Sequence, residues 1–314
     1  MISVVIPLFD KAHTIERTLE SVWRQSVPAC QVIIVDDGST DGGGELVQRL
    51  AHPRLHVVRQ PNRGVSAARN LGIELATSPL IALLDADDEW DETHLADLLE
   101  TSERFPAAVA VGTAFRRRDA RGRIRLQRLS SASHPYLIED YLGFCLSFEA
   151  AFSSSSVAVK RAPLVRSGGF PLGVTQGEDL VTWARLSCEG PVAFCPRVSA
   201  TYHIRPASGP PRPAMPDEVS ALLSELAAHP GVSAALGGYL ASWHRIRADW
   251  YCERDERAAC LRELGHAIRA AGPRRRDVLI AASLAIPARP RALLFDMVRR
   301  IRLVGARGEN ARHP

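Results

Sequence analysis

An acidic cluster follows an apolar run in the first third of the chain, with four carboxylates within five positions: Asp85, Asp87, Asp88 and Glu89. Asp85 and Asp87, separated by one residue, offer the hard oxygen ligands that divalent cations prefer. Carboxylates placed this closely repel each other, so we expect a cation to compensate them. The alternative is a solvated acidic turn that starts a helix over residues 91–105, because acidic side chains favour a helix N-terminus.

A second acidic cluster, beginning with Asp36 and Asp37, also follows an apolar run, and Gly38 there permits a tight turn with positive φ. The apolar runs 2–6, 32–35, 55–58 and 80–84 predict strands, and helical spacing in 11–25, 45–50 and 66–76 predicts helices between them. Strands alternating with helices imply a parallel sheet with right-handed crossovers. Both acidic clusters should therefore meet at one edge, where such sheets bind ligands.

This convergence suits a nucleotide that carries a leaving group. A carboxylate at one strand end can accept hydrogen bonds from a nucleobase or ribose, and the pair at the other can hold a metal ion on the diphosphate. A third acidic pair, Glu178 and Asp179, follows Gly177 and a short loop after Gly168-Gly169-Phe170. It lies in the first turn of a helix predicted through residue 186, where capping alone would also favour carboxylates.

Four motifs in this order resemble family 2 glycosyltransferases, whose fold is the GT-A type. They are Val-Val-Ile-Pro at 4–7, Val-Asp-Asp-Gly-Ser-Thr-Asp at 35–41, Asn-Arg-Gly-Val-Ser-Ala-Ala-Arg-Asn-Leu-Gly at 62–72 and Leu-Leu-Asp-Ala-Asp-Asp at 83–88. The resemblance is dense over about the first 105 residues and thinner to about residue 208. It implies a mixed, Rossmann-like α/β sheet that binds a nucleotide sugar.

The resemblance also implies roles for individual residues. The positions that would contact the nucleotide sugar, usually a UDP-sugar, are Pro7, Asp36, Asp37, Asn62, Arg69, Asp85, Ala86 and Asp87. Asp85 and Asp87 match the DxD motif that holds Mg²⁺ or Mn²⁺, and Asp179 matches the general base, with Glu178 as the substitute. Each has a structural alternative: Asp36 could cap a turn, and Arg69 could be a solvated helix residue.

Three residues after the base motif could complete the site. His203 could join Asp87 at the metal, although a single histidine beside a strand is more often structural. Arg205 and Ser208 could close over the diphosphate, because a guanidinium makes charge-assisted contacts with phosphate. These assignments together predict a metal-dependent, inverting transfer, in which Asp179 deprotonates an acceptor hydroxyl and no covalent enzyme intermediate forms.

The middle of the chain leaves alternatives open. An arginine-rich turn around Gly122 reads as a solvated hairpin or as a contact for a phosphorylated or lipid-linked acceptor. Residues 152–159 predict a strand in which Ser153 to Ser156 either face the acceptor or are simply small. We expect a catalytic domain over 1–210, with a nucleotide-sugar half at 1–105 and an acceptor half at 106–210. A proline-rich linker then leads to a helical region at 211–314.

Composition bounds the partners. The 314 residues carry a net charge of +4, but the last 46 hold eleven arginines against three acidic residues. Residues 291–304 could form a basic amphipathic helix on an anionic membrane surface, or could pack on the protein. The six cysteines form no CxxC pair, and the N-terminus lacks a signal-peptide pattern. We therefore expect a cytoplasmic protein, with possible peripheral contact with the inner membrane face.

Two other functions remain as alternatives. A sugar-nucleotide nucleotidyltransferase would need a glycine-rich phosphate loop after the first strand, and residues 7–10 do not provide one. A non-catalytic nucleotide-sugar-binding protein would keep the same pocket without turnover. Nucleic-acid binding is disfavoured, because the basic residues of the tail lack interleaved aromatic residues and a nucleic-acid motif.

Overall fold

The computed structural model describes residues 1–50, 52–127, 132–148, 150–204 and 212–285. Two compact units divide the chain. The first comprises residues 1–204 and 214–239 of the described part, and the second comprises residues 212–213 and 240–285. The first unit therefore continues beyond residue 210. The predicted linker and basic tail fall largely outside the described residues.

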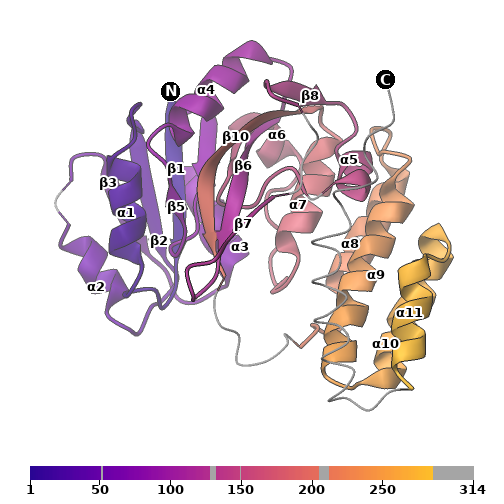
Figure 1. The fold of residues 1–314 in the computed structure, drawn as a ribbon. Coiled ribbons are helices and arrows are strands. Elements are labelled where there is room, and N and C mark those ends of the chain that lie inside the picture. The colour runs from indigo at the N-terminus through magenta and orange to yellow at the C-terminus, as the bar shows by residue number, and fades with distance from the viewer. Residues whose placement is uncertain (51, 128–131, 149, 205–211, 286–314) are drawn as a thin grey trace. The chain divides into compact units, whose positions relative to one another are not determined.

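The first unit is built on a mixed sheet whose strands, among the described residues, follow the order β3-β2-β1-β4-β9-β6-β10-β5 (Figure 1). Two further strands pair beside this path, β7 with β6 and β8 with β10. The strands are β1 (Ile2–Leu8), β2 (Gln31–Asp36), β3 (Leu55–Arg59), β4 (Leu80–Leu83), β5 (Glu89–Trp90), β6 (Ala110–Arg118), β7 (Ile124–Leu126), β8 (Tyr136–Ile138), β9 (Val157–Lys160) and β10 (Val192–His203).

Strands β1 to β4 are parallel to one another, as predicted. Because β2 and β4 both flank β1, the acidic clusters that follow them lie at the same edge of the sheet. Strand β9 runs antiparallel between β4 and β6 and makes the sheet mixed. The expected mixed α/β sheet, with parallel strands in its first part, is thus confirmed.

Helices cover both faces of this sheet. The helices of the first unit are α1 (Ile15–Trp23), α2 (Gly43–Gln48), α3 (Val65–Leu75), α4 (His94–Arg104), α5 (Tyr141–Ser147), α6 (Arg161–Arg166), α7 (Glu178–Ser187) and α8 (Glu218–Glu225), followed by a 3₁₀ turn at Leu226–Ala228. Ile15 and Leu19 of α1 and Leu95 of α4 join Val4 and Ile6 of β1 in one buried cluster. Successive strand residues point to opposite faces of a sheet, so Val5 of β1 points away from this cluster. Helix α3 packs on that opposite face, with Gly72 against Val5.

Helix α4 and strand β9 differ from their predicted bounds, whereas a predicted hairpin agrees with the structure. Helix α4 begins at His94 rather than 91, because Glu89 and Trp90 form β5 and the Asp91 amide donates to the Ser199 carbonyl. Residues 153–156 form a turn instead of extending the strand, and β9 begins at Val157. The predicted hairpin around Gly122 is confirmed, with β6 and β7 antiparallel and Gly122 at φ +75°.

The second unit is helical, as predicted for the C-terminal region. It contains α9 (Leu236–Glu253) from residue 240 onward, α10 (Arg257–Ala271) and α11 (Arg275–Ser283). Its apolar core is small and is lined by Ala248, Tyr251, Cys252, Ala259, Cys260, Leu264, Ile280 and Leu284.

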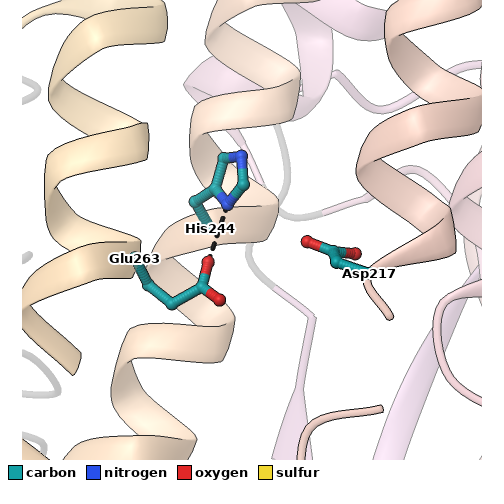
Figure 2. A group of neighbouring side chains, drawn as sticks. All are labelled: Asp217, His244 and Glu263. Carbon is teal, nitrogen blue, oxygen red and sulfur yellow. Dashed lines mark hydrogen bonds and ion pairs between the residues drawn. The ribbon is translucent and has the colours of Figure 1, made fainter. Parts of the chain in front are cut away.

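Buried ion pairs supplement that core. Arg245 makes two contacts of 2.8 Å with Asp277, and Glu263 lies 2.9 Å from Arg247. Figure 2 shows the contact of 2.7 Å between Glu263 and Nδ1 of His244. These pairs link α9 to α10 and α11, so we interpret them as structural.

Two sequence expectations about the environment can be compared with the structure. All six cysteines lie in the described residues, and none of them is in a disulfide. Among the helices in the described ranges, none combines the length and the apolar character that crossing a membrane requires. The proposed amphipathic helix at 291–304 lies outside those ranges, so its membrane contact stays a prediction.

Candidate active site

The DxD segment lines a cavity of about 740 Å³ at the carboxyl edge of the sheet. Asp85, Ala86 and Asp87 line it from the end of β4, and Asp37 lines it from the end of β2. The two acidic clusters therefore face one cavity, as the alternation of strands and helices predicted. Pro7 and Asn62 also line this cavity, which we call the donor pocket.

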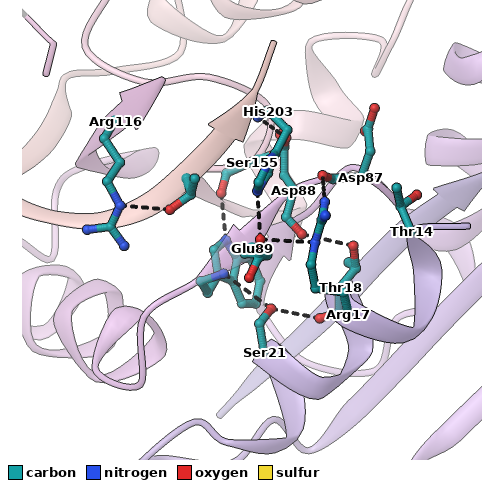
Figure 3. A network of polar contacts seen from close by, with 12 residues as sticks. Thr14, Arg17, Thr18, Ser21, Asp87, Asp88, Glu89, Arg116, Ser155 and His203 are labelled. Atoms are coloured by element: carbon teal, nitrogen blue, oxygen red, sulfur yellow. Dashed lines mark hydrogen bonds and ion pairs between the residues drawn. The ribbon is translucent and has the colours of Figure 1, made fainter. Parts of the chain in front are cut away.

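Helix α1 fixes the path of the DxD segment. Thr14, directly before α1, donates to the Ala86 carbonyl, and Arg17 and Thr18 of α1 donate to the carbonyls of Asp87 and Asp88. These hydrogen bonds to three consecutive carbonyl oxygens are 2.8 to 2.9 Å long, and Figure 3 shows the side chains. Positions 14, 17 and 18 lie on one face of a helix, because residues three or four apart are neighbours there. A polar stripe on the amphipathic helix thus holds the backbone between the two carboxylates.

Asp88 is a structural support and not a solvated turn residue, because it is only 1% exposed. Its carboxylate accepts hydrogen bonds from the Ser155 hydroxyl at 2.5 Å and from the His203 amide at 2.9 Å (Figure 3). The Ser155 hydroxyl in turn accepts from the Asp85 amide at 3.1 Å. Burial, and then the charge of Asp85, raise the pKa of Asp88 well above its ordinary value. The sequence assigned no role to Asp88, and it left open whether Ser155 faces the acceptor or is simply a small residue.

Arg69 joins the two halves of the first unit. Its guanidinium lies 2.7 Å from Asp85 and 2.9 Å from Glu178 and stacks over the Phe170 ring. The adjacent Asn70 donates to the Phe170 carbonyl at 2.7 Å and accepts from its amide at 2.9 Å. Arg69 is 3% exposed, so it is not the solvated residue of the alternative interpretation. Its predicted contact with the nucleotide stays a prediction, since both of these partners are carboxylates.

Glu178 and Asp179 differ in their surroundings although they are adjacent. Both lie in the first turn of α7, after Gly177 in the left-handed region. Glu178 is held by Arg69, whereas Asp179 accepts the Leu180 amide at 2.8 Å. Burial, and then the neighbouring charge of Glu178, raise the pKa of Asp179 from 3.8 to about 6. A carboxylate with this pKa is ionised at neutral pH and accepts a proton readily.

The two acidic residues after β2 also divide their roles. Asp37 accepts hydrogen bonds from the amides of Arg63 and Gly64, at 2.9 and 2.8 Å, and from the Gln60 amide group at 2.7 Å. It therefore orders the 60–64 loop at the pocket wall. Asp36 is fully buried, accepts the Ser39 amide and does not line the pocket. Within this pair, the pocket favours Asp37 for nucleotide contact and places Asp36 in the turn.

Of the three residues predicted to complete the site after the base motif, the structure describes only His203. Nε2 of His203 lies 2.6 Å from Glu89, which also pairs with Arg17 at 3.0 Å (Figure 3). Metal ligation by this nitrogen would require that it leave Glu89. Arg205 and Ser208 lie outside the described residues.

Two pocket residues were missed by the sequence reasoning. Lys11 lies 3.1 Å from Asp87, and Tyr202 lines the pocket directly before His203. Burial and nearby carboxylates, Asp88 foremost, raise the pKa of Tyr202 to about 12, so its phenol stays protonated and can donate a hydrogen bond. No motif marked either residue, although Lys11 stands one turn before the polar stripe of α1.

The residues present fit a divalent cation. Asp85 and Asp87 offer carboxylate oxygens, which are the ligands that Mg²⁺ and Mn²⁺ prefer. Each already lies beside a cationic side chain, Asp85 beside Arg69 and Asp87 beside Lys11.

Comparison with known proteins connects this geometry to a family. The model of "Glycosyl transferase family 2" matches residues 3–164. The succinoglycan biosynthesis protein ExoO of Rhizobium meliloti is 31% identical over 216 residues, covering 66% of this chain and 62% of ExoO. The putative teichuronic acid biosynthesis glycosyltransferase TuaG of Bacillus subtilis is 40% identical over 103 residues, covering 32% of this chain and 41% of TuaG. The chain thus spans less than two thirds of the length of these relatives.

Solved structures show the same fold. The crystal structure of S. aureus TarS 1-349 in complex with UDP-GlcNAc matches with a TM-score of 0.67 at 18% identity, over 99% of this chain and 93% of that one. At this identity the likeness shows the fold.

Proposed function

The chain belongs to glycosyltransferase family 2, and from this premise we propose that it transfers a sugar from a nucleoside diphosphate donor, most plainly a UDP-sugar, to a glycan or lipid-linked acceptor. The named relatives belong to succinoglycan and teichuronic acid biosynthesis, which supports a place in cell-surface polysaccharide synthesis. The TarS structure contains UDP-GlcNAc, which supports a UDP-sugar donor. Family membership leaves the nucleotidyltransferase alternative without support.

One observation carries the proposal: a single guanidinium, that of Arg69, links the DxD carboxylate Asp85 to the acidic pair at the start of α7. This contact brings the start of α7, which carries the proposed base, close to the DxD segment, and it supports the proposal. A sugar bound between them would have its leaving group beside Asp85 and Asp87 and its acceptor beside Asp179. That is the arrangement that an in-line displacement requires.

Asp179 is the proposed general base. Glu178 is held in its ion pair with Arg69, whereas the pKa of about 6 makes Asp179 an effective proton acceptor near neutral pH. Asp179 takes the proton from the acceptor hydroxyl as the hydroxyl oxygen bonds to the anomeric carbon and the bond to the diphosphate breaks. One displacement of this kind inverts the anomeric configuration, and the enzyme forms no covalent intermediate.

The leaving diphosphate gains negative charge that the pocket must stabilise. When bound, a Mg²⁺ or Mn²⁺ ion supplies Lewis-acid stabilisation of that charge, and Asp87 and Asp85 are the residues that would hold it. Asp37 keeps the 60–64 loop in place at the nucleoside end of the pocket. Tyr202 offers a phenol proton on the pocket wall.

The proposal is tested by nucleotide binding and release. Differential scanning fluorimetry with UDP-, GDP- and dTDP-sugars, each with Mn²⁺, should show one nucleotide class that raises the melting temperature, because a ligand of the folded state stabilises it. The stabilising donor should then release its nucleoside diphosphate in a coupled assay. Indifference to every nucleotide would refute the function, and binding without any release would favour the non-catalytic alternative.

We also propose that the reaction takes place on the cytoplasmic side, with peripheral contact of the basic tail with the inner membrane face. The arginine excess after residue 269 supports it. Flotation with vesicles containing phosphatidylglycerol should recover the full chain and leave a chain ending after residue 285 in the dense fraction. Equal flotation of the two chains would remove the membrane contact.

A further inference from the structure

Lys11 occupies a position in the donor pocket that the assigned roles leave unexplained. Its Nζ lies 3.1 Å from Oδ2 of Asp87, and the side chains of the pair are 22% and 17% exposed. Lys11 and Asp87 both line the pocket where the diphosphate would lie. The ammonium group is therefore within reach of two kinds of anion, the Asp87 carboxylate and a bound phosphate.

The backbone around Lys11 is held in place. Asp10 accepts the Thr40 amide at 2.8 Å, and the Ala12 amide donates to Asp41 at 2.8 Å. The Lys11 carbonyl accepts a hydrogen bond of 3.0 Å from the amide of Ile15, which is the first residue of α1. Two hydrogen bonds to the 40–41 loop and one to α1 thus fix the point from which the lysine side chain extends.

The same element positions Asp87. Positions 11, 14 and 18 lie on one face of the turn and helix, and Thr14 and Thr18 donate to the carbonyls of Ala86 and Asp88 on either side of Asp87. The Lys11 contact is therefore the first in a row of contacts that the turn before α1 and α1 itself make with this segment. A flexible surface pair would have no such support.

The residue type also fits an exchangeable contact. The chain has two lysines, Lys11 and Lys160, among its 39 basic residues. Arginine binds a carboxylate through a rigid fork, whereas lysine is a compact point charge on a flexible stem. At position 11 the chain thus carries the cation that can leave one oxygen and approach another.

We propose that Lys11 exchanges between Asp87 and the donor diphosphate: it neutralises Asp87 before the donor binds, and it moves to a phosphate oxygen when a divalent cation takes its place on the carboxylate. The inference rests on the proposed function for the identity of the phosphate ligand. The exchange predicts opposite effects of one substitution on two ligands. Without Lys11, its ammonium group no longer competes with a metal ion for Asp87, and the nucleotide loses a positive partner.

The test measures, by isothermal titration calorimetry, the binding of Mn²⁺ alone and the binding of UDP to protein that is already saturated with Mn²⁺. Lys11→Met should bind Mn²⁺ about fivefold more tightly and UDP about fivefold more weakly, the change expected for a partly exposed ion pair. Lys160→Met makes the same change of charge in β9, outside the donor pocket, and should leave both affinities unchanged. Melting temperatures establish that the variants fold, and Lys11→Gln repeats the test with a polar side chain.

A double variant ties the effect to Asp87. In an Asp87→Asn background, Lys11→Met should no longer raise the affinity for Mn²⁺. Unchanged Mn²⁺ affinity in Lys11→Met, a gain that persists with Asp87→Asn, or unchanged UDP affinity would each overturn the exchange. A wild-type protein that binds none of UDP, GDP or dTDP would instead refute the proposed function, while the Mn²⁺ titration would still decide whether Lys11 competes for Asp87.

Discussion

Neutralising Asp179 should stabilise the protein while abolishing transfer. A carboxyl group whose pKa is higher in the folded state than in the unfolded chain costs stability when it ionises. A rise from 3.8 to about 6 corresponds to a cost of about 3 kcal/mol at most, at about 1.36 kcal/mol per pKa unit. Asp179→Asn removes this cost, so its melting temperature should rise by several degrees at pH 8.

The pH dependence of this gain has a fixed sign. Below pH 3.8 Asp179 is protonated in both states, so the variant and the wild type should differ little. The difference should grow between pH 3.8 and about 6 and stay constant above. Melting followed by circular dichroism from pH 4 to pH 8 measures it directly.

Glu178→Gln is the matched control, because it removes the adjacent carboxylate with the opposite consequence. Glu178 pairs at 2.9 Å with Arg69, whose side chain is only 4% exposed. Breaking a pair of this kind leaves a buried charge short of a partner, so we expect a loss of about 1 to 3 kcal/mol. Two neighbouring neutralisations should therefore shift stability in opposite directions.

Activity provides the second readout. Loss of a general base lowers kcat by about 10² to 10⁴, and Asp179→Asn should fall in this range in a nucleotide-release assay with acceptor. In the wild type, kcat should fall about tenfold per pH unit below pH 6 and be level above it, because only the ionised base accepts a proton. A variant that melts below the wild type at pH 8, or a wild-type rate that is level through pH 6, would refute the reasoning about Asp179.

Three further outcomes are expected. Ser155→Ala removes the hydroxyl that bridges the Asp85 amide and the Asp88 carboxylate, so it should weaken Mn²⁺-dependent nucleotide binding in calorimetry. Ser153→Ala is the control, and equal binding in Ser155→Ala and wild type would contradict the role of the bridge. Gly72→Ala places a Cβ 2.3 Å from Val5 in the core and should cost about 1 to 3 kcal/mol in urea unfolding, whereas unchanged stability would show that α3 can shift. Removing divalent ions with EDTA should stop transfer and Mn²⁺ should restore it, whereas full activity in EDTA would refute metal dependence.

The sequence by itself determined the part of the fold that contains β1 to β4. Apolar runs that alternate with amphipathic segments can bury both faces of a sheet only as parallel strands between helices. This placed the ends of β2 and β4 at one edge and brought Asp37, Asp85 and Asp87 to one cavity. The hydrophobic periodicity that predicts these elements is local, and the order of the elements along the chain then places both strand ends at one edge of the sheet.

The tertiary structure decided which polar residues face the pocket and which support it. Asp36 and Asp37 are adjacent in an acidic motif, yet only the backbone turn after β2 determines that Asp37 lines the pocket. Asp88 looked like part of a solvated turn until Ser155, 67 positions away, was found to hold its carboxylate. A contact between two residues so far apart in the sequence produces no hydrophobic periodicity from which it could be predicted.

The same limit applies to the roles of cationic side chains. A helical arginine such as Arg69 reads as a phosphate ligand or as a surface residue, and its burial between Asp85 and Glu178 appears only when β4 and α7 are brought together. Lys11 carried no motif, because its significance depends on Asp87, 76 positions later. Sequence patterning therefore fixes where a sheet gathers its charges, whereas packing between distant segments decides how those charges are paired.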